Sequence, residues 1–373
     1  MTVTVDADFP GGNIIVEEID GSRLVVRQDP RDTAEWWFWW DFRVRGAAGR
    51  TLRVEFAGPR GPVGPNGAVM STDRRTWRWV GGEHDTRHVV CRVPDGADDL
   101  YLAFSFPYQS ADLERFVAAH LGHPDFHSSR LCTTRAGRPA PLLAIGDPQG
   151  AKRNVLLSCR HHACESVASY VLEGVMEWLL SDAAEALRLT TAFTIVPMVD
   201  LDGVEAGDQG KARAPHDHGR DYIDEPLYPT VRAMKRLVGD LLERHLVLFV
   251  DFHCPWISDG GNESFFLVEP PEPLAGSLHA FADILRRTPT GPVPYTGKFD
   301  VPHGTSWNVP TPGLLGPRGY LQQVGGKDLL TAFALECSYS TTEGPPVTPE
   351  SARQFGRGFA TAVEQFLAAH PTP

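Results

Sequence analysis

The feature that most constrains the fold is a set of short apolar runs, interleaved with helical patterns, after about residue 140. The candidate strands are 142–145, 154–158, 192–199, 246–252, 265–268 and 330–335. Most of these runs are continuously apolar rather than alternating, as expected of strands that are buried on both faces of a sheet. Long helical patterns at 166–189 and 229–244 lie between them. Strands interleaved with helices predict an α/β fold with a mixed, mostly parallel sheet that is covered by helices.

The first hundred or so residues have a different hydrophobic pattern. Short runs with every second residue apolar, such as 51–56, are separated by turns rich in Gly and Pro, such as 58–67. This pattern is typical of a small antiparallel β-sandwich. A helix is then expected from Ser110, where Asp112 and Glu114 follow as early acidic residues.

These sequence patterns divide the chain into three parts. We expect a β-sandwich domain at 1–108, a linker helix and connection at 109–140, and an α/β catalytic domain at 141–373. The run of aromatic residues at 36–40 is expected to fill the sandwich core and a face between the domains, and a carbohydrate-binding surface is the alternative.

Composition excludes several function classes. Among 373 residues, 35 Lys and Arg stand against 47 Asp and Glu, and a net charge of −12 argues against a nucleic-acid partner. No apolar run approaches the roughly 18 residues needed to cross a bilayer, so no membrane partner is expected. The first residues lack a secretory pattern. Six cysteines without a CxxC pair favour reduced thiols and a cytoplasmic location.

A pair of metal-ligand residues follows the candidate strand 154–158. His162 and Glu165 are three residues apart on the loop before a helix, and imidazole and carboxylate both suit Zn²⁺. For an isolated pair, however, an acidic residue at a helix start beside a solvated histidine is the more common explanation.

Two other strands strengthen the metal interpretation. Run 246–252 leads directly into His253, and run 330–335 leads into Glu336. Because ligand sites in open α/β sheets lie beyond the carboxyl ends of the strands, these side chains should share one edge of the sheet. Two histidines and one glutamate form a catalytic zinc set with an open position, and a further carboxylate can accept a proton from water.

The chain resembles zinc metallocarboxypeptidases of the carboxypeptidase A superfamily, most closely the cytosolic carboxypeptidase branch. The matching segments are HACE at 162–165, VPMVDLDGV at 196–204, DHGRDY at 217–222, DFHCP at 251–255 and ALECSY at 334–339. The segments at 68–80 and 107–116 resemble the amino-terminal domain and linker of that branch.

The resemblance implies roles for individual residues. One zinc ion per chain would be bound by His162, Glu165 and His253, and Glu336 would be the general base. Asp217 would hydrogen-bond the imidazole of His162 and fix its tautomer. Arg220 would hold the terminal carboxylate of the substrate through a two-bond fork.

The chain also departs from the family pattern. Gly219 stands where the family usually has an asparagine, which removes one hydrogen-bond donor. The family arginine that polarises the scissile carbonyl has no clear counterpart, and Lys211 or Arg213 would take its role. Tyr320 is a candidate for the active-site tyrosine, with a loop or core position as the alternative. His161 is expected to face solvent.

The resulting hypothesis is a zinc hydrolase that removes C-terminal residues from peptides or proteins, by metal-activated water with Glu336 as base. One alternative is a zinc amidase or deacylase that acts on N-acyl amino acids or peptidoglycan stem peptides. A second is a metal-binding module without turnover, against which the intact Glu336 argues. The oligomeric state is not specified by any pattern in the sequence.

Overall fold

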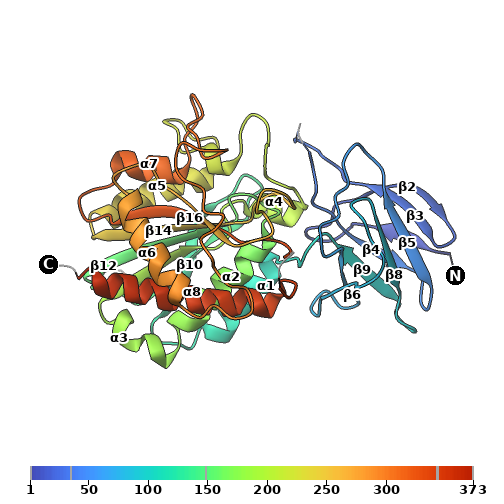
Figure 1. Ribbon diagram of the computed structural model, residues 1–373, viewed down its shortest axis with the longest axis horizontal. Coiled ribbons are helices and arrows are strands. Elements are labelled where there is room, and N and C mark those ends of the chain that lie inside the picture. Colours follow the sequence, from blue (N-terminus) through green and yellow to red (C-terminus); the bar gives the residue numbers. More distant parts are fainter. Residues whose placement is uncertain (1, 34–35, 148, 342–343, 372–373) are drawn as a thin grey trace.

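The computed structural model describes residues 2–33, 36–147, 149–341 and 344–371, and these form three β-sheets. Two of the sheets are made by the N-terminal residues and lie at one end of the molecule (Figure 1). The third sheet and the helices make up the larger part, so the sandwich and the α/β sheet are separate bodies in the fold.

The two N-terminal sheets face each other. Their strands are β1 (Thr4–Asp6), β2 (Ile15–Asp20), β3 (Arg23–Arg27), β4 (Asp41–Arg45), β5 (Thr51–Phe56), β6 (Val69–Ser71), β7 (Arg78–Trp79), β8 (His88–Arg92) and β9 (Asp99–Ala103). One sheet has the order β1-β4-β9-β6-β7 and the other β2-β3-β5-β8. The Trp40 ring packs against Phe56 of the opposite sheet, with the ring centroids 4.7 Å apart. The predicted β-sandwich is therefore confirmed, although β3 and β5 pair in parallel.

The third sheet has seven strands in the order β10-β11-β13-β12-β14-β16-β15. They are β10 (Phe126–Thr133), β11 (Pro139–Ile145), β12 (Arg153–Cys159), β13 (Thr191–Val196), β14 (Leu246–His253), β15 (Phe266–Val268) and β16 (Thr331–Glu336). The central strands β13, β12, β14 and β16 are parallel, and the outer pairings are antiparallel. Every residue of β12, β13 and β16 is buried, so the predicted mixed sheet with a buried parallel centre is confirmed.

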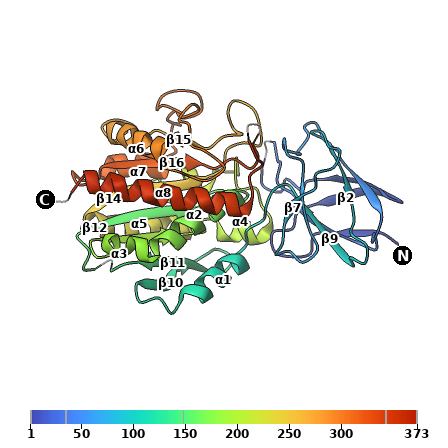
Figure 2. The ribbon, with the colours of Figure 1, turned by 60° about the horizontal axis from the view of Figure 1, so that its bottom comes forward.

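Helices cover both faces of this sheet. They are α1 (Ser110–His120), α2 (Ser166–Leu179), α3 (Glu185–Arg188), α4 (Leu201–Ala206), α5 (Pro229–Leu242), α6 (Ala275–Arg287), α7 (Pro317–Val324) and α8 (Pro349–Ala369). Figure 2 shows α2 and α8 side by side along the sheet. Alternate residues of β12 point to opposite faces: Val155 and Leu157 pack in the core that includes α2 and α8, whereas Leu156 packs with residues of α5.

Two boundaries differ from the sequence-based expectation. The helix expected over 166–189 ends at Leu179, and a 3₁₀ turn and α3 follow. Ser181 and Asp182 lie at the break, and such side chains favour caps and turns over helix interiors. The expected connection 109–140 also contains β10, which pairs with β11 at the edge of the large sheet. Much of β10 is exposed and polar, so it lacks the apolar run that marks the central strands.

No helix in the part of the chain that the structure describes is long and apolar enough to span a membrane.

Candidate active site

Three neighbouring parallel strands bring the predicted site residues to one edge of the large sheet. In the register of the sheet, Cys159 at the end of β12 pairs with Phe252 of β14, and His253 pairs with Glu336 of β16. The loop after β12 carries His162 and Glu165. The carboxyl ends of the strands therefore meet where the sequence predicted.

A buried carboxylate joins the two histidines. His162 Nδ1 lies 2.8 Å from Glu165 Oε1, and His253 Nδ1 lies 2.8 Å from Glu165 Oε2. One ligand atom from each of these residues lies within 4.8 Å of the others. Two imidazole nitrogens and a carboxylate are a suitable donor set for a zinc ion. The residues present therefore fit the predicted metal.

Lys211 contacts this group directly. Its Nζ lies 2.7 Å from Glu165 Oε1 and donates a hydrogen bond to the carbonyl oxygen of Cys254 at 2.6 Å. Burial by itself would lower the pKa of Lys211, but the carboxylates of Glu165 and Glu336 outweigh it and raise that pKa above its usual range. Burial likewise opposes ionisation of Glu165, whose pKa is nevertheless held well below normal, with Lys211 the largest of the groups that lower it. Lys211 is therefore a charged group inside the site.

Glu336 is also buried, and the nearby charges of His253 and Lys211 compensate only in part for its desolvation. Its Oε2 has no hydrogen-bond partner in the described structure, and burial raises the pKa of the carboxyl group above its usual range. A desolvated carboxylate with a raised pKa is suited to accept a proton from water at neutral pH.

His162 and His253 each have a carboxylate beside the ring nitrogen that faces away from Glu165. Asp217 Oδ1 lies 3.5 Å from His162 Nε2, and Asp251 Oδ2 lies 2.7 Å from His253 Nε2. Burial opposes ionisation of Asp217, but the interaction with His162 and the charges of Arg220 and His218 together outweigh it, and the pKa of Asp217 falls to about 2. Carboxylates in these positions fix the tautomer that leaves Nδ1 free to bind a metal.

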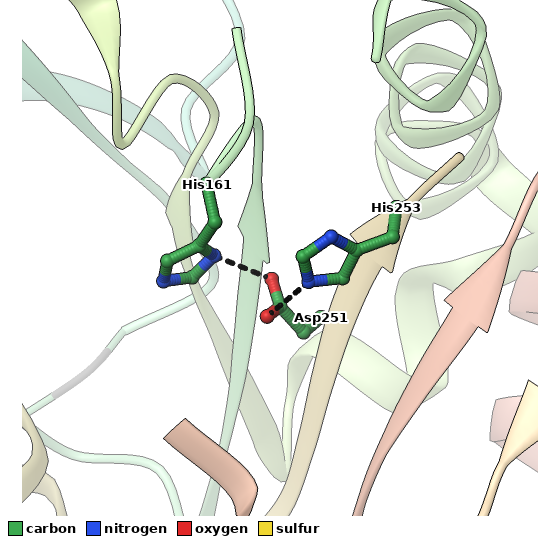
Figure 3. Close-up of side chains that lie close together, drawn as sticks. All are labelled: His161, Asp251 and His253. Carbon is green, nitrogen blue, oxygen red and sulfur yellow. Dashed lines mark hydrogen bonds and ion pairs between the residues drawn. The ribbon is translucent and has the colours of Figure 1, made fainter. Parts of the chain in front are cut away.

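His161 lies in the interior, and the expectation that it faces solvent is wrong. Its Nδ1 is 2.9 Å from Asp251 Oδ1, and its Nε2 is 2.9 Å from the hydroxyl oxygen of Tyr222. Figure 3 shows His161 and His253 on either side of Asp251. Arg160 has a left-handed backbone conformation with φ of 61°, so the chain turns sharply after β12 and brings His161 over the neighbouring strand.

His161, Asp251 and His253 also meet the geometric requirement for a metal site, but hydrogen bonds account for their arrangement. Asp251 accepts from both imidazoles and from the Ser158 hydroxyl at 2.8 Å. Because Tyr222 is available as a donor to His161 Nε2, we assign Nδ1 as the donor of the hydrogen bond to Asp251. We therefore interpret this group as a support for His253.

Gly219 lies directly behind His162. A β-carbon at this position would be 3.2 Å from Asp217 Oδ1 and 3.3 Å from His162 Nε2. A larger residue would thus need a small shift of these side chains, and glycine allows Asp217 and His162 to pack closely here. Arg220, by contrast, is half exposed and donates a hydrogen bond to Thr311 Oγ1 at 2.8 Å, so its guanidinium group is accessible to a ligand.

The remaining predicted residues are less central. Arg213 is almost buried and forms ion pairs of 2.7 to 2.8 Å with Asp32, Asp200 and Asp208. Tyr320 on α7 packs its ring against Tyr222, with the centroids 5.8 Å apart. Among the contacts of the described residues, none joins Tyr320 to His162, Glu165 or His253.

Sequence reasoning missed Arg318, at the second position of α7. Its Nη1 donates to the carbonyl oxygen of Glu269 at 2.9 Å. Burial lowers the pKa of Arg318, while the nearby charges of Glu336 and Asp251 oppose that shift. No motif surrounds this arginine, so only the folded chain shows that it lies near the predicted base.

Comparisons with known proteins agree with this geometry. The family "Zinc carboxypeptidase" matches residues 116–225, and the family "Cytosolic carboxypeptidase N-terminal domain" matches residues 5–105. The first match includes His162, Glu165, Asp217 and Arg220, and it ends before His253 and Glu336.

Three relatives illustrate the likeness. Cytosolic carboxypeptidase 2 of Mus musculus is 31% identical over 177 residues, which is 43% of this chain and 20% of that protein. Cytosolic carboxypeptidase 3 of Mus musculus is 27% identical over 293 residues, 68% of this chain and 29% of that protein. A crystal structure of a metallo-carboxypeptidase from Burkholderia cenocepacia has a TM-score of 0.81 at 21% identity and covers 100% of both chains.

The chain spans about a fifth to a half of the length of the curated relatives it matches. Within that span, residues 116–225 are similar to the zinc carboxypeptidase family and residues 5–105 to the N-terminal domain of the cytosolic carboxypeptidases. The predicted family resemblance is thereby confirmed, and the structural match confirms the predicted fold.

The support behind His253 can be tested by replacing His161 with Phe. Loss of the hydrogen bond to Asp251 should weaken zinc binding by up to about 10-fold, the lower end of the usual effect of removing the partner of a metal ligand, because His161 acts on His253 only through Asp251. Tyr222→Phe removes only one hydroxyl group and should have a smaller effect in the same direction. Zinc affinity is measured by competition with a chromophoric chelator. Wild-type affinity in a correctly folded His161→Phe protein would contradict the supporting role.

Proposed function

We propose that this protein is a zinc metallocarboxypeptidase that removes C-terminal residues from peptides or proteins. The observation that carries the proposal is the convergence of His162, Glu165 and His253 at a sheet edge where Glu336 Oε2 is buried without a hydrogen-bond partner among the described residues. The family matches independently point to zinc carboxypeptidases.

His162 Nδ1, His253 Nδ1 and the Glu165 carboxylate would hold one zinc ion. When bound in such a set, zinc lowers the pKa of water and polarises a carbonyl group. In this proposal Glu336 accepts the proton of the attacking water and later passes it to the leaving amine. Asp217 and Asp251 keep the two imidazoles oriented throughout.

Lys211 is the better candidate for polarising the scissile carbonyl. Its ammonium group contacts the carboxylate of Glu165, one of the proposed metal ligands. The guanidinium group of Arg213, by contrast, already forms ion pairs with three carboxylates. Arg220 is exposed enough to bind the terminal carboxylate of a substrate. Tyr320 stays a candidate, although among the described residues no contact joins it to His162, Glu165 or His253.

The location and the domain division are also part of the proposal. All six cysteines are free, and five of them are buried, which agrees with a reducing, cytoplasmic environment. We propose domains at 1–108 and 141–373 joined by the segment 109–140, with β10 of that segment contributing to the catalytic sheet.

Replacing His162, Glu165 or His253 with Ala should nearly abolish zinc binding, because each change removes one of only three protein ligands. Metal content after dialysis measures the effect, and circular dichroism checks the fold. His279→Ala, a change at an exposed histidine on α6, is the matched control and should retain zinc. Full zinc content in all three variants would contradict the ligand assignment.

Glu336→Gln should lower turnover by at least about 10²- to 10⁴-fold while zinc is retained, because the amide cannot accept a proton. The side chains have nearly the same size, so the fold is expected to persist. Steady-state hydrolysis of a peptide, with zinc content measured on the same sample, gives the result. Near wild-type turnover would show that another group accepts the proton.

Amidation of the substrate's C-terminus should abolish cleavage if Arg220 recognises a free carboxylate. A lost hydrogen bond to a charged group costs about 1.5–3 kcal/mol. Arg220→Ala should therefore reduce kcat/KM for the free acid and erase the difference between the two substrates. Arg220→Lys keeps the charge but loses the two-bond fork, so its kcat/KM for the free acid should lie between those of the wild-type protein and Arg220→Ala.

Cleavage of free and amidated peptides by the wild-type protein distinguishes the carboxypeptidase hypothesis from the amidase or deacylase hypothesis. Equal cleavage of free and amidated peptides would overturn the carboxypeptidase assignment, while the zinc hydrolase assignment would stand. The amidase or deacylase alternative would then be tested with N-acyl amino acids and peptidoglycan stem peptides.

A further inference from the structure

We infer that the N-terminal domain positions Lys211, so that the β-sandwich completes the active site of the catalytic domain. The inference rests on the proposed function, in which the ammonium group of Lys211 polarises the scissile carbonyl. Two stretches of the N-terminal domain make the contacts, residues 32–33 and residues 36–39.

The segment that carries Lys211 is irregular. It lies between the end of α4 at Ala206 and the 3₁₀ turn that begins at His218. Gly210 and Ala212 flank Lys211 with φ values of 81° and 50°. A left-handed conformation is uncommon for alanine and persists only when the surroundings hold it. Contacts from outside the segment must therefore fix the position of Lys211.

The first anchor is Gln209, two residues before Lys211. Gln209 is fully buried, and its Oε1 accepts hydrogen bonds from the backbone amides of Phe38 at 2.6 Å and Trp39 at 3.3 Å. Its Nε2 donates to the carbonyl oxygen of Trp36 at 3.1 Å. One side chain thus ties the start of the segment to the backbone of three sandwich residues, Trp36, Phe38 and Trp39.

The second anchor follows Lys211. The backbone amide of Ala214 donates to the carbonyl oxygen of Asp32 at 3.1 Å, and Arg213 Nε lies 2.7 Å from the Asp32 carboxylate. Thr33 forms an isolated β-bridge with Arg213. Lys211 is therefore held on both sides by residues of the N-terminal domain.

The side chain of Lys211 is supported as well. Its Nζ lies 5.8 Å from the ring centroid of Trp256, which stacks on Trp36 with the centroids 5.7 Å apart and the planes 2° apart. Trp256 belongs to the catalytic domain and Trp36 to the sandwich. A lysine is a flexible point charge without the rigid fork of arginine, so its placement depends on such surroundings.

The test is a double-mutant cycle with Gln209→Ala and Lys211→Met, using the full-length zinc protein. A displacement of about 1 Å can cost about 10²-fold in rate, so Gln209→Ala should lower kcat/KM by up to that factor. In the Lys211→Met background the same change should have little further effect, because interacting sites are not additive. Zinc content should stay unchanged.

Two further variants serve as a substitute for Gln209→Ala and as a control. Asp32→Ala removes only the partially exposed carboxylate, and it replaces Gln209→Ala if that protein does not fold. Trp79→Phe breaks a different bond between the domains, from the indole nitrogen to the carbonyl oxygen of Val347 at 2.7 Å, and should leave kcat/KM unchanged. A similar loss from Gln209→Ala with and without Lys211, or no loss at all, would overturn the inference.

A second readout does not depend on turnover. Acylation of lysines by a small anhydride, followed by mass spectrometry, should modify Lys211 slowly in the wild-type protein and faster in Gln209→Ala, but not in Trp79→Phe. A wild-type protein without peptidase activity would overturn the proposed function, and the labelling would still decide whether the sandwich holds Lys211. Unchanged labelling in Gln209→Ala would overturn the positioning role and leave the proposed function intact.

Discussion

The arrangement of the site depends on one buried carboxylate. Glu165 has no exposed surface, and an ionised group in such a place is costly unless charged or hydrogen-bonding partners surround it. Lys211, His162 and His253 supply these partners from an irregular segment, a loop after β12 and the end of β14. A fold that stabilises Glu165 must therefore gather the same atoms that would bind a metal.

Each of the two histidines that contact Glu165 also has hydrogen-bonding or charged partners on its other side. His253 donates to Asp251, which is itself bonded to His161 and Ser158, and the hydroxyl group of Tyr222 closes the series. On the other side, Asp217 contacts His162 and lies against Gly219. Hydrogen-bonded networks of this kind fix ring orientation and tautomer together. Glu336 is the contrasting case, because burial outweighs the nearby charges of His253 and Lys211 and raises the pKa of the carboxyl group.

Contacts between the β-sandwich and the α/β part of the chain support this arrangement. Gln209 and Arg213 face the sandwich, while Lys211 between them faces Glu165. The aromatic run at 36–40 was expected to fill the sandwich core and an interdomain face, and it does both: Trp40 packs between the sheets, and Trp36 stacks on Trp256. The β-sandwich thus hydrogen-bonds Gln209, which is only two positions before Lys211 in the sequence.

The sequence by itself determined the features that depend on local patterns. Continuous apolar runs marked the central strands, and the residues that follow them, His253 and Glu336, were placed at the sheet edge because strand ends converge there. Only the tertiary structure decided which charges meet. His161 is buried against Asp251, which is 90 residues away in the chain, and Lys211 rather than Arg213 reaches Glu165. These choices follow from desolvation and partner geometry between distant segments, which leave no periodic signal in the sequence.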